Sequence, residues 1–414
     1  MESLIVMDAE QSSLRPPIYL DGHATTPLAP EAAAAMAPWW HELSANAHSP
    51  HAAGQNAAVA VEQARFHVAR LIGADPGEII FTSGATEANA LAIIGLAHAA
   101  RTARDNRHRI VVSAIEHKSV LESAHRLARD GFEIVIAPVT ASGVVDLQSL
   151  ARLVTDDTLL VSVMAANNEV GVVQPIEDVA AIVRAHGALL HIDASQQVGK
   201  LPIDLNIADF ASISSHKMYG PVGVGALFIS AATTLQPEPL FAGGAQERGL
   251  RPGTLPVPLI VGFGAAARVA RTALERDIGH ARRLAEQMTE GLSSQKVSFI
   301  VNGLDERRLP GSLSLRLVGC DAASIIARLS PTVSIAEGSA CTSGQITPSH
   351  VLTAMGQSAE IASQTVRILC GRYSTENEIL AAAEAIGRAV QQETIAHWTG
   401  SPVGSVHEGL SARF

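Results

Sequence analysis

Short apolar runs alternate with alanine-rich stretches between about residues 60 and 230, and this alternation constrains the fold more than any other feature. The runs are rich in β-branched residues, and each is long enough for one strand: EIIFT, RIVVSAI, FEIVIAPV, LLVSVMA, LLHID, FASIS and GALFIS. Unbroken apolar strands separated by helices indicate a largely parallel sheet that is covered on both faces. The sequence therefore predicts a doubly wound α/β domain, whose ligands bind at the carboxyl ends of the strands.

The pattern changes after about residue 260. The segment 262–297 contains no proline, which predicts one long helix or a bent pair that leads away from the large domain. Beyond it, SLSLRL and TVRILC are typical of strands, and helical patterns lie near DAASIIARL, SHVLTAMG and ENEILAAAEAIGRAVQQ. We expect a large domain over residues 27–270, a small α+β domain over 271–400 with residues 1–26 packed on it, and a loose tail over 401–414.

Composition and net charge indicate which kinds of partner this protein binds. With 414 residues, 47% of them hydrophobic, the chain can bury a large core. A net charge of -10 without a dense Lys/Arg cluster argues against nucleic acid or an anionic membrane as the main partner. The N-terminus MESLIVMDAEQ does not have the pattern of a signal or transit peptide, and no stretch is expected to span a bilayer. We expect a cytoplasmic protein that acts on a small molecule.

A carboxylate and a lysine follow two consecutive predicted strands. Asp193 ends LLHID, and Lys217 comes shortly after FASIS. An enzyme that binds pyridoxal phosphate needs this pair, the carboxylate for the pyridine nitrogen and the lysine for an imine. A solvated lysine and a helix-capping aspartate are the ordinary alternatives. After EIIFT, the turn SGAT opens into a helix and forms an anion site that includes the Thr86 hydroxyl, unless it is a simple helix cap.

Other polar residues come after strands at the same expected edge of the sheet. His117 could lie on a cofactor ring or move protons, although a histidine at a strand end is more often structural. Asn168 and Gln196 offer neutral hydrogen bonds, with a turn and a surface position as their alternatives. Ser214 and His216 precede the lysine and could bind a phosphate group. These positions predict one polar site and leave the role of each residue open.

Cysteine usage points to one candidate nucleophile. Three widely spaced cysteines form neither a disulfide framework nor a metal-binding CxxC pair. Cys341 lies in SIAEGSACTSGQITPSH, a run of small polar residues typical of an exposed loop, where a reactive thiol is as plausible as a structural one. Cys370 ends an apolar run and Cys320 also favours a structural role. Arg367, inside TVRIL, would need an anion if buried, either a substrate carboxylate or an internal salt bridge.

With these residues in view, the chain resembles the cysteine desulfurases of the fold-type I pyridoxal phosphate enzymes from residue 19 to about residue 390. The matching segments occur in the family's order: YLDGHATTP, TSGATEAN, EHKSV, NNEVGVVQPI, HIDASQQVGKLPIDL, SSHKMYGPVGVGAL, GGAQERGLRPGTLPV and GSACTSG. The segment around Cys341 is similar to the subgroup with a longer, flexible cysteine loop. The resemblance implies a large doubly wound sheet domain, a smaller α+β domain and a homodimer with shared active sites.

Four residues are assigned to the cofactor ring by the resemblance. Lys217 would be the Schiff-base lysine, and Asp193 would pair with the pyridine nitrogen. His117 would stack on the ring, and Gln196 would form a hydrogen bond with its phenolic oxygen. Together with Cys341, the resemblance implies Lys217 and His117 as catalytic residues, with His117 as the candidate base for the thiol.

The remaining assignments concern the phosphate and the substrate. The phosphate would be held by residues of two segments and one residue of the other subunit: Ala85 through its backbone, Thr86, Ser214 and His216, and Thr254 across the dimer. Asn168 and Arg367 would receive the substrate carboxylate, and Asn168 would also contact the cofactor.

Three features depart from the family pattern. Ala336 and Glu337 replace two serines, which places a negative charge four residues before Cys341 and is expected to raise the pKa of that thiol. The N-terminal motif contains Gly22-His23, and NAHSPH takes the place of an NPSS-like segment. Neither of these falls on residues with assigned chemistry, and both are expected to affect substrate entry. The C-terminal tail does not resemble a scaffold-docking tail.

The resemblance implies an enzyme that converts L-cysteine to L-alanine and holds the sulfur as a persulfide on Cys341 for an acceptor protein. Iron-sulfur cluster assembly, tRNA thiolation and DNA phosphorothioation are the expected pathways. A selenocysteine lyase, an aminotransferase of the same fold and a sulfur-delivery subunit that needs a partner are the alternatives.

Overall fold

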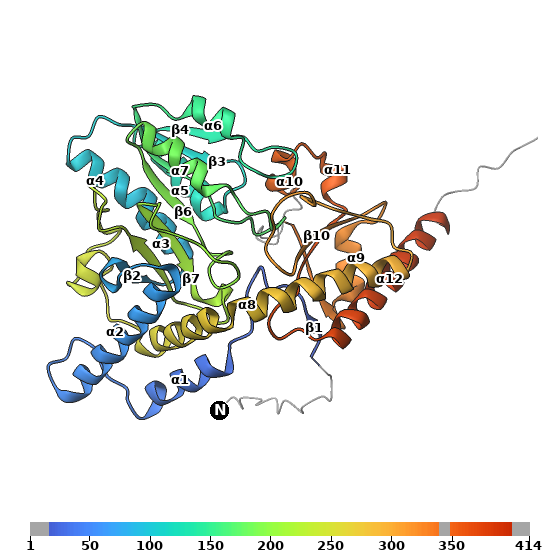
Figure 1. Cartoon of the computed structure of the whole chain (residues 1–414), viewed down its shortest axis with the longest axis horizontal. Coiled ribbons are helices and arrows are strands. Elements are labelled where there is room, and N and C mark those ends of the chain that lie inside the picture. Colours follow the sequence, from blue (N-terminus) through green and yellow to red (C-terminus); the bar gives the residue numbers. More distant parts are fainter. Residues whose placement is uncertain (1–15, 339–347, 400–414) are drawn as a thin grey trace, which may run out of the picture.

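Seven strands form the larger sheet of the structure, a computed structural model that describes residues 16–338 and 348–399. The strands are β2 (Ile79–Thr82), β3 (Arg109–Ser113), β4 (Glu133–Ala137), β5 (Thr158–Ser162), β6 (Leu189–Asp193), β7 (Phe210–Ser214) and β8 (Gly225–Ile229). Their order in the sheet is β2-β8-β7-β6-β5-β3-β4 (Figure 1). Each of the seven apolar runs singled out in the sequence contributes one strand, so the predicted sheet is confirmed.

The direction of the strands sets where their carboxyl ends lie. The neighbours β7, β6, β5, β3 and β4 pair in parallel, whereas β8 runs antiparallel to both β2 and β7. Six strands therefore point the same way, and their carboxyl ends share one edge. The predicted mostly parallel sheet is correct, with β8 as the exception.

Helices cover both faces of this sheet. One face packs against α2 (Ala52–Ile72), α6 (Leu147–Leu153), α7 (Ile176–Ala185) and the first part of α8 (Val257–Ser294). The other packs against α5 (Lys118–Ala128) and a continuous helical run made of α3 (Ala85–Ala90), a π-helical turn (Leu91–Gly95) and α4 (Leu96–Thr102). Successive strand residues alternate between the two cores, as Ile79, Ile80 and Phe81 of β2 do, because side chains in a strand alternate in direction.

A second, antiparallel sheet forms from the C-terminal part of the chain. Its strands, in the order β12-β13-β10-β9, are β12 (Ala336–Glu337), β13 (Thr365–Leu369), β10 (Ser312–Leu317) and β9 (Phe299–Val301). The helices α9 (Ala322–Leu329) and α12 (Glu376–Thr399) and the second part of α8 pack on it. The short helices α10 (His350–Ala354) and α11 (Ala359–Ala362) lie between β12 and β13 in the chain.

The N-terminal segment packs beside this second sheet. β1 (Ile18–Tyr19) pairs in parallel with β11 (Val333–Ser334), and Leu20 is buried in the core of the smaller sheet. The chain then crosses to α1 (Pro30–His41), which lies along α8 (Figure 1). Residues 21–29 thus pass between the two sheets, and the division at residues 270 and 271 stays a prediction because α8 runs through it unbroken.

Helix α8 connects the two cores. It contributes Ala270 to the core of the larger sheet and Leu284 to that of the smaller one, which agrees with the predicted long helix. By length and composition it could cross a membrane, contrary to the expectation that no stretch would qualify. However, 56% of its most apolar window is buried inside the protein. Apolar residues along the first half of α8 are therefore accounted for by core packing.

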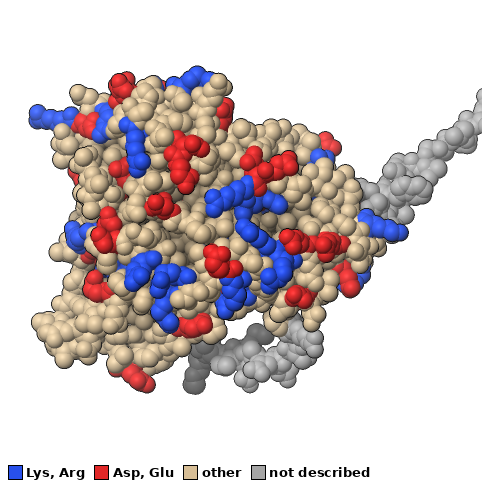
Figure 2. All heavy atoms as spheres, in the orientation of Figure 1, with Lys and Arg blue, Asp and Glu red and all other residues tan. Residues whose placement is uncertain are grey.

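Charges of both signs occur side by side on the surface. Lys and Arg side chains form a broken band across the middle of the face in Figure 2, with Asp and Glu side chains beside and between them. Despite the net charge of -10, this face of the molecule is therefore not uniformly acidic.

A buried ion pair joins α2 to the segment before α8. The Arg65 guanidinium donates to both carboxylate oxygens of Glu247, at 2.8 and 2.7 Å, and to the carbonyl oxygen of Ile79 at 2.8 Å. Glu247 also accepts the backbone N–H of Phe81 at 2.7 Å. Glu247 and Arg248 have φ of +47° and +59°, a region that is unfavourable for residues with a side chain. The ion pair holds this strained turn against the edge strand β2.

Removing one partner of this buried pair should be costly. We expect Glu247→Ala to lower the free energy of unfolding by about 3 kcal/mol, because it removes the buried counter-ion of Arg65 and the acceptor of the Phe81 N–H, and leaves only the exposed Glu62 beside the guanidinium. Glu62→Ala is the matched control, since Glu62 also bonds Arg65, at 3.1 Å, but is 62% exposed; we expect a loss of at most about 0.5 kcal/mol. Urea denaturation measures both. Equal losses in the two variants would contradict a dominant role for the buried partner.

Candidate active site

The polar residues predicted from the sequence meet at the shared carboxyl edge of the larger sheet. Asp193 is the last residue of β6, and Ser214 is the last residue of β7. Lys217 follows Ser214 in the short helix η3 (Ser215–Lys217). His117 is the N-cap of α5, just after β3. Residues separated by up to about a hundred positions in the chain thus reach one site because their strands run in parallel.

Neutral donors orient the Asp193 carboxylate, which is 6% exposed. Asn89 of α3 donates its Nδ2 hydrogen to Oδ2 at 2.9 Å, and the backbone N–H of Ser195 donates to Oδ1 at 3.0 Å. Within the described part of the chain, no Lys, Arg or His forms an ion pair with Asp193. A buried carboxylate of this kind is a natural partner for a cationic ring nitrogen. Asn89 was not singled out from the sequence, although it lies in the quoted segment TSGATEAN.

His117 belongs to the same network. Asn89 donates to the hydroxyl of Ser119 at 2.8 Å, and that hydroxyl lies 2.8 Å from Nδ1 of His117. The Ser119 backbone N–H also donates to Nδ1, at 3.1 Å, so Nδ1 acts as an acceptor and the neutral ring carries its proton on Nε2. Burial, partly offset by Asp193, lowers the pKa of His117. This tautomer favours donation from Nε2 over the predicted role as base for a thiol.

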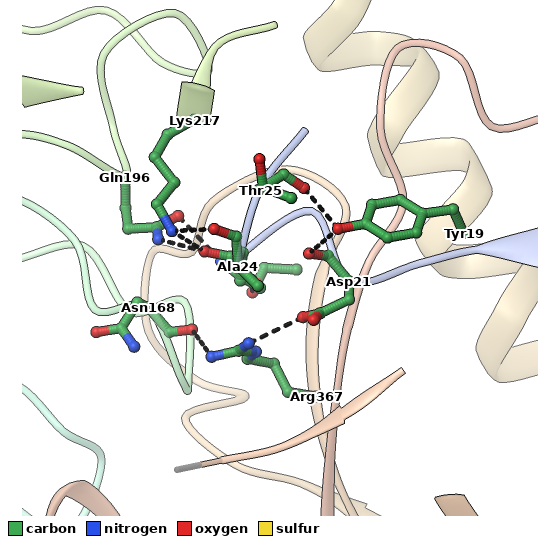
Figure 3. Close-up of polar contacts among 10 residues, drawn as sticks. Tyr19, Asp21, Ala24, Thr25, Asn168, Gln196, Lys217 and Arg367 are labelled. Atoms are coloured by element: carbon green, nitrogen blue, oxygen red, sulfur yellow. Dashed lines mark hydrogen bonds and ion pairs between the residues drawn. The ribbon is translucent and has the colours of Figure 1, made fainter. Parts of the chain in front are cut away.

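The amine of Lys217 lies against the N-terminal segment. Its Nζ donates to the carbonyl oxygens of His23 at 2.5 Å and Ala24 at 2.6 Å (Figure 3). A neighbouring buried lysine, Lys200, donates to the backbone oxygens of Lys217 at 2.7 Å and Gln196 at 3.1 Å. Burial, and next the charge of Lys217, lower the pKa of Lys200 to about 7. Lys200 thus holds the backbone of two predicted site residues and was not anticipated as part of the site.

The predicted phosphate residues gather near the start of α3 and the end of β7. The Ser214 hydroxyl is buried and has no hydrogen-bond partner among the described residues. His216 Nδ1 lies 3.0 Å from the Thr25 hydroxyl, and burial, followed by the charge of Lys217, lowers the His216 pKa to about 4. Ala85 and Thr86 begin α3, whose first N–H groups are free to bind an anion. The orphaned hydroxyl and these N–H groups fit a phosphate.

Thr254 is not brought to the site within one chain. It is exposed on the segment between η4 (Gln246–Gly249) and α8, and it forms no hydrogen bond to the other predicted residues in the described ranges. Its predicted place across a dimer interface is consistent with this exposed position and stays a prediction.

Arg367 on β13 forms the internal salt bridge, one of the two alternatives that the sequence left open, and its binding of a substrate carboxylate stays a prediction. Its Nη2 donates to Asp21 Oδ1 at 2.9 Å, and its Nη1 donates to the backbone oxygen of Asn168 at 3.2 Å (Figure 3). The side chain is 4% exposed, and its Nε has no partner among the described residues. The predicted internal salt bridge is therefore present, and the predicted neighbour Asn168 lies beside it.

Two buried carboxyl groups near the site were missed by the sequence analysis. Glu116 accepts the backbone N–H of Met164 at 2.6 Å, and burial raises its pKa well above the usual range. Burial also raises the pKa of Glu169, to about 7, although the Ser349 hydroxyl bonds to it and Arg367 and Lys118 oppose the shift. Glu116 directly precedes the predicted residue His117, and Glu169 directly follows the predicted residue Asn168. This proximity in the sequence is the signal that could have identified them.

The structure describes two of the three cysteines. Cys341 lies outside the described residues, so its predicted position and reactivity stay predictions. Cys320 and Cys370 are buried, as expected for structural cysteines, and burial raises the pKa of Cys370 to about 12. Glu337 ends β12, where burial, with a further contribution from Asp321, raises its own pKa.

The second departure from the family pattern lies closer to the chemistry than expected. The His23 ring contacts the Gln196 side chain, with 3.1 Å between Nδ1 and Oε1, and the carbonyl oxygen of His23 accepts from Lys217. The expectation that Gly22-His23 affects only substrate entry is therefore wrong, because residues 21–29 cross the site between the two sheets.

Comparisons with known proteins show which proteins this chain resembles over most of its length. Residues 18–381 match the family described as Aminotransferase class-V. The chain is 43% identical to the cysteine desulfurase IscS of Rickettsia bellii, over 90% of this chain and 91% of the relative. A solved NifS-like protein superposes with a TM-score of 0.84 at 36% identity, covering 91% of this chain and all of the other (100%). SspA in complex with cysteine superposes with a TM-score of 0.75 at 36% identity, covering 86% and 100% of the two chains.

The raised pKa of Glu169 predicts a pH-dependent change in stability. Its pKa of about 7 lies above the ordinary 4.5, so its stabilising contribution is complete below pH 4.5 and is lost as the pH rises to about 7. We expect Glu169→Gln and the natural protein to be similarly stable near pH 4.5, and the variant to be more stable by about 1–3 kcal/mol at pH 8.

Chemical denaturation across this pH range measures the difference. Glu122→Gln, at an exposed position of α5, is the matched control and should show no such trend. A difference between Glu169→Gln and the natural protein that stays constant with pH would contradict the raised pKa.

Proposed function

Because the chain belongs to the class-V aminotransferase family and is a pyridoxal phosphate-dependent cysteine desulfurase, we propose that it moves sulfur from L-cysteine to Cys341. The observation that carries the proposal is the convergence of the Asp193 carboxylate and the Lys217 amine at one edge of the sheet. The products are L-alanine and a persulfide on Cys341, from which an acceptor protein receives the sulfur.

The residues of the site suit the cofactor. Asp193 would pair with the ring nitrogen, and Lys217 would attach the cofactor covalently. Ser214, His216 and the start of α3 would hold the phosphate. When bound, pyridoxal phosphate supplies an electron sink for bonds at the substrate's α and β carbons. The support for this assignment is the buried carboxylate without a cationic partner in the described chain and the orphaned Ser214 hydroxyl.

Arg367 is proposed to receive the substrate carboxylate. A guanidinium binds a carboxylate through charge-assisted hydrogen bonds, and the Nε of Arg367, which has no partner among the described residues, adds to the groups that face Asp21 and Asn168. The substrate would compete with Asp21 for this cation. Asp21 thereby keeps a buried positive charge neutralised when substrate is absent, since an unpaired buried charge is unfavourable.

The chain's own residues carry the proton and sulfur transfers. Lys217 takes a proton from the α carbon of cysteine and returns one to the product. The Cys341 thiolate attacks the substrate sulfur, so that an S–S bond forms as the C–S bond breaks. The electron pair of the broken bond stays on the β carbon, which gains a proton and becomes the methyl group of alanine. His117 would stack on the cofactor ring, with its proton on Nε2 in the tautomer favoured by Ser119.

We also propose a cytoplasmic homodimer in which Thr254 reaches the phosphate of the partner's site. Large apolar side chains on α1 and α2 are exposed in the single chain, among them Trp40, Val59 and Phe66, and such a group favours a protein interface. For the acceptor, iron-sulfur assembly, tRNA thiolation and DNA phosphorothioation stay predictions. Capture of proteins on the Cys341-persulfide form would separate them.

Two substitutions separate cofactor binding from sulfur transfer. The purified protein should be yellow and release alanine from L-cysteine. Cys341→Ala should keep the colour and lose persulfide formation, because only the nucleophile is gone, whereas Lys217→Ala should lose the covalent attachment of the cofactor. Absorbance, alanine release and persulfide detection measure these outcomes, with Cys320→Ala as the control thiol. A colourless natural protein that cannot be reconstituted with pyridoxal phosphate would contradict the proposal.

Arg367 offers a test of substrate binding. We expect Arg367→Gln to stay yellow and to lower kcat/KM for L-cysteine about 10- to 100-fold, since it removes charge-assisted bonds to the substrate carboxylate. Arg316→Gln on the neighbouring strand β10 is the matched control, because Arg316 bonds Gln364 at 3.1 Å and not the site. Steady-state kinetics measure kcat/KM for both variants. Equal effects of the two substitutions would contradict a role of Arg367 in substrate binding.

A further inference from the structure

His23 lies buried between the two sheets, at the position where this chain departs from the family's N-terminal motif. It is 1% exposed, and both ring nitrogens have side-chain partners. Nδ1 lies 3.1 Å from Oε1 of Gln196, and Nε2 lies 2.8 Å from the hydroxyl of Ser312 on β10. One side chain thus connects the predicted cofactor residue Gln196 to the smaller sheet.

The hydrogen bonds determine the tautomer of this ring. The Gln196 amide nitrogen donates to the backbone oxygen of His23 at 3.0 Å, so the amide oxygen faces the ring. An amide oxygen only accepts, which places the ring proton on Nδ1. Nε2 is then an acceptor for the Ser312 hydroxyl. Burial, followed by the charges of Arg367 and Lys200, lowers the pKa of His23 well below its usual range, in keeping with a neutral ring.

His23 therefore holds the Gln196 side chain at both ends. The ring binds the amide oxygen, and the backbone oxygen of the same residue binds one amide hydrogen. An amide nitrogen has two hydrogens, so the second is left to point away from His23. A flipped amide would set its oxygen against the backbone oxygen of His23, where neither atom can donate, and would require the other tautomer of the ring. The orientation of Gln196 is thus decided by residue 23.

The same residue also contacts the amine of the site. The backbone oxygen of His23 accepts from Lys217 Nζ as well as from Gln196. The charged groups around the ring are Lys200, Lys217 and Arg367. A change in the His23 ring would therefore reach both the amide and the amine that are proposed to meet the cofactor.

We propose that His23 is a positioning residue that fixes the Gln196 amide so that its free N–H donates to the phenolic oxygen of the bound cofactor. The inference rests on the proposed function and adds a residue to which the family resemblance assigns no role. A donor at that oxygen stabilises the form with more negative charge there and so lowers the pH at which the yellow cofactor loses its proton. His23 sets this pH through Gln196.

A matched pair of substitutions separates the two bonds of the ring. In His23→Asn, the side-chain amide nitrogen takes the place of Nδ1 and keeps the bond to Gln196. In His23→Gln, the amide reaches the place of Nε2 and keeps only the bond to Ser312. Titration of the cofactor's absorbance with pH should show a transition raised by about 0.5–1 pH unit in His23→Gln, and close to that of the natural protein in His23→Asn.

Two further variants complete the test. Ser312→Ala should lower the thermal unfolding temperature without moving the colour transition, because Nδ1 keeps its partner. In a Gln196→Leu background, His23→Gln should cause no additional shift. An unmoved transition in His23→Gln, equal shifts in the Asn and Gln variants, or an additional shift without Gln196 would overturn the inference. A natural protein without any colour transition would instead overturn the proposed function.

Discussion

The parallel alignment of β5, β6 and β7 is the constraint on which the site depends. Parallel neighbours bring their carboxyl ends to one edge, where the chain leaves the sheet and its polar residues escape the apolar core. Asp193 and Ser214 are the final residues of two such strands, and Lys217 follows three residues later. If one of these strands ran in the opposite direction, its polar terminus would lie at the far side of the sheet.

Burial then decides the chemical state of the groups at this edge. It lowers the pKa of Lys200 to about 7 and of His216 to about 4, and it raises the pKa of Glu169 to about 7. Charges removed from water need a partner or become neutral. Arg367 pairs with Asp21, and the hydrogen bonds of His23 and His117 fix the tautomers of their neutral rings. The hydrogen-bonded network that runs from Asp193 through Asn89 and Ser119 to His117 supplies such partners.

Some assignments could be made from the sequence and others could not. Lys217, Asp193 and Ser214 carried a signal because each follows an apolar strand, and all three reach the same edge. Lys200 and Asn89 were not singled out, and His23 stood out only as a departure from the family motif, since their importance comes from contacts across more than a hundred positions or from backbone oxygens. The tautomer of His117 could not be predicted from the sequence, because it depends on a backbone N–H two residues away, which no pattern of residue types reveals.

The residue pattern alone was sufficient for the seven strands, the long helix α8, the class of enzyme and its cofactor, because these follow from hydrophobic periodicity and from motifs continuous in the chain. The folded molecule was needed to learn that Arg367 pairs with Asp21, that Gln196 is oriented by His23 and that Glu169 is buried. Each of these depends on segments that approach one another in space. Hydrogen bonds and desolvation act over a few ångströms, and the distance between residues along the chain does not determine them.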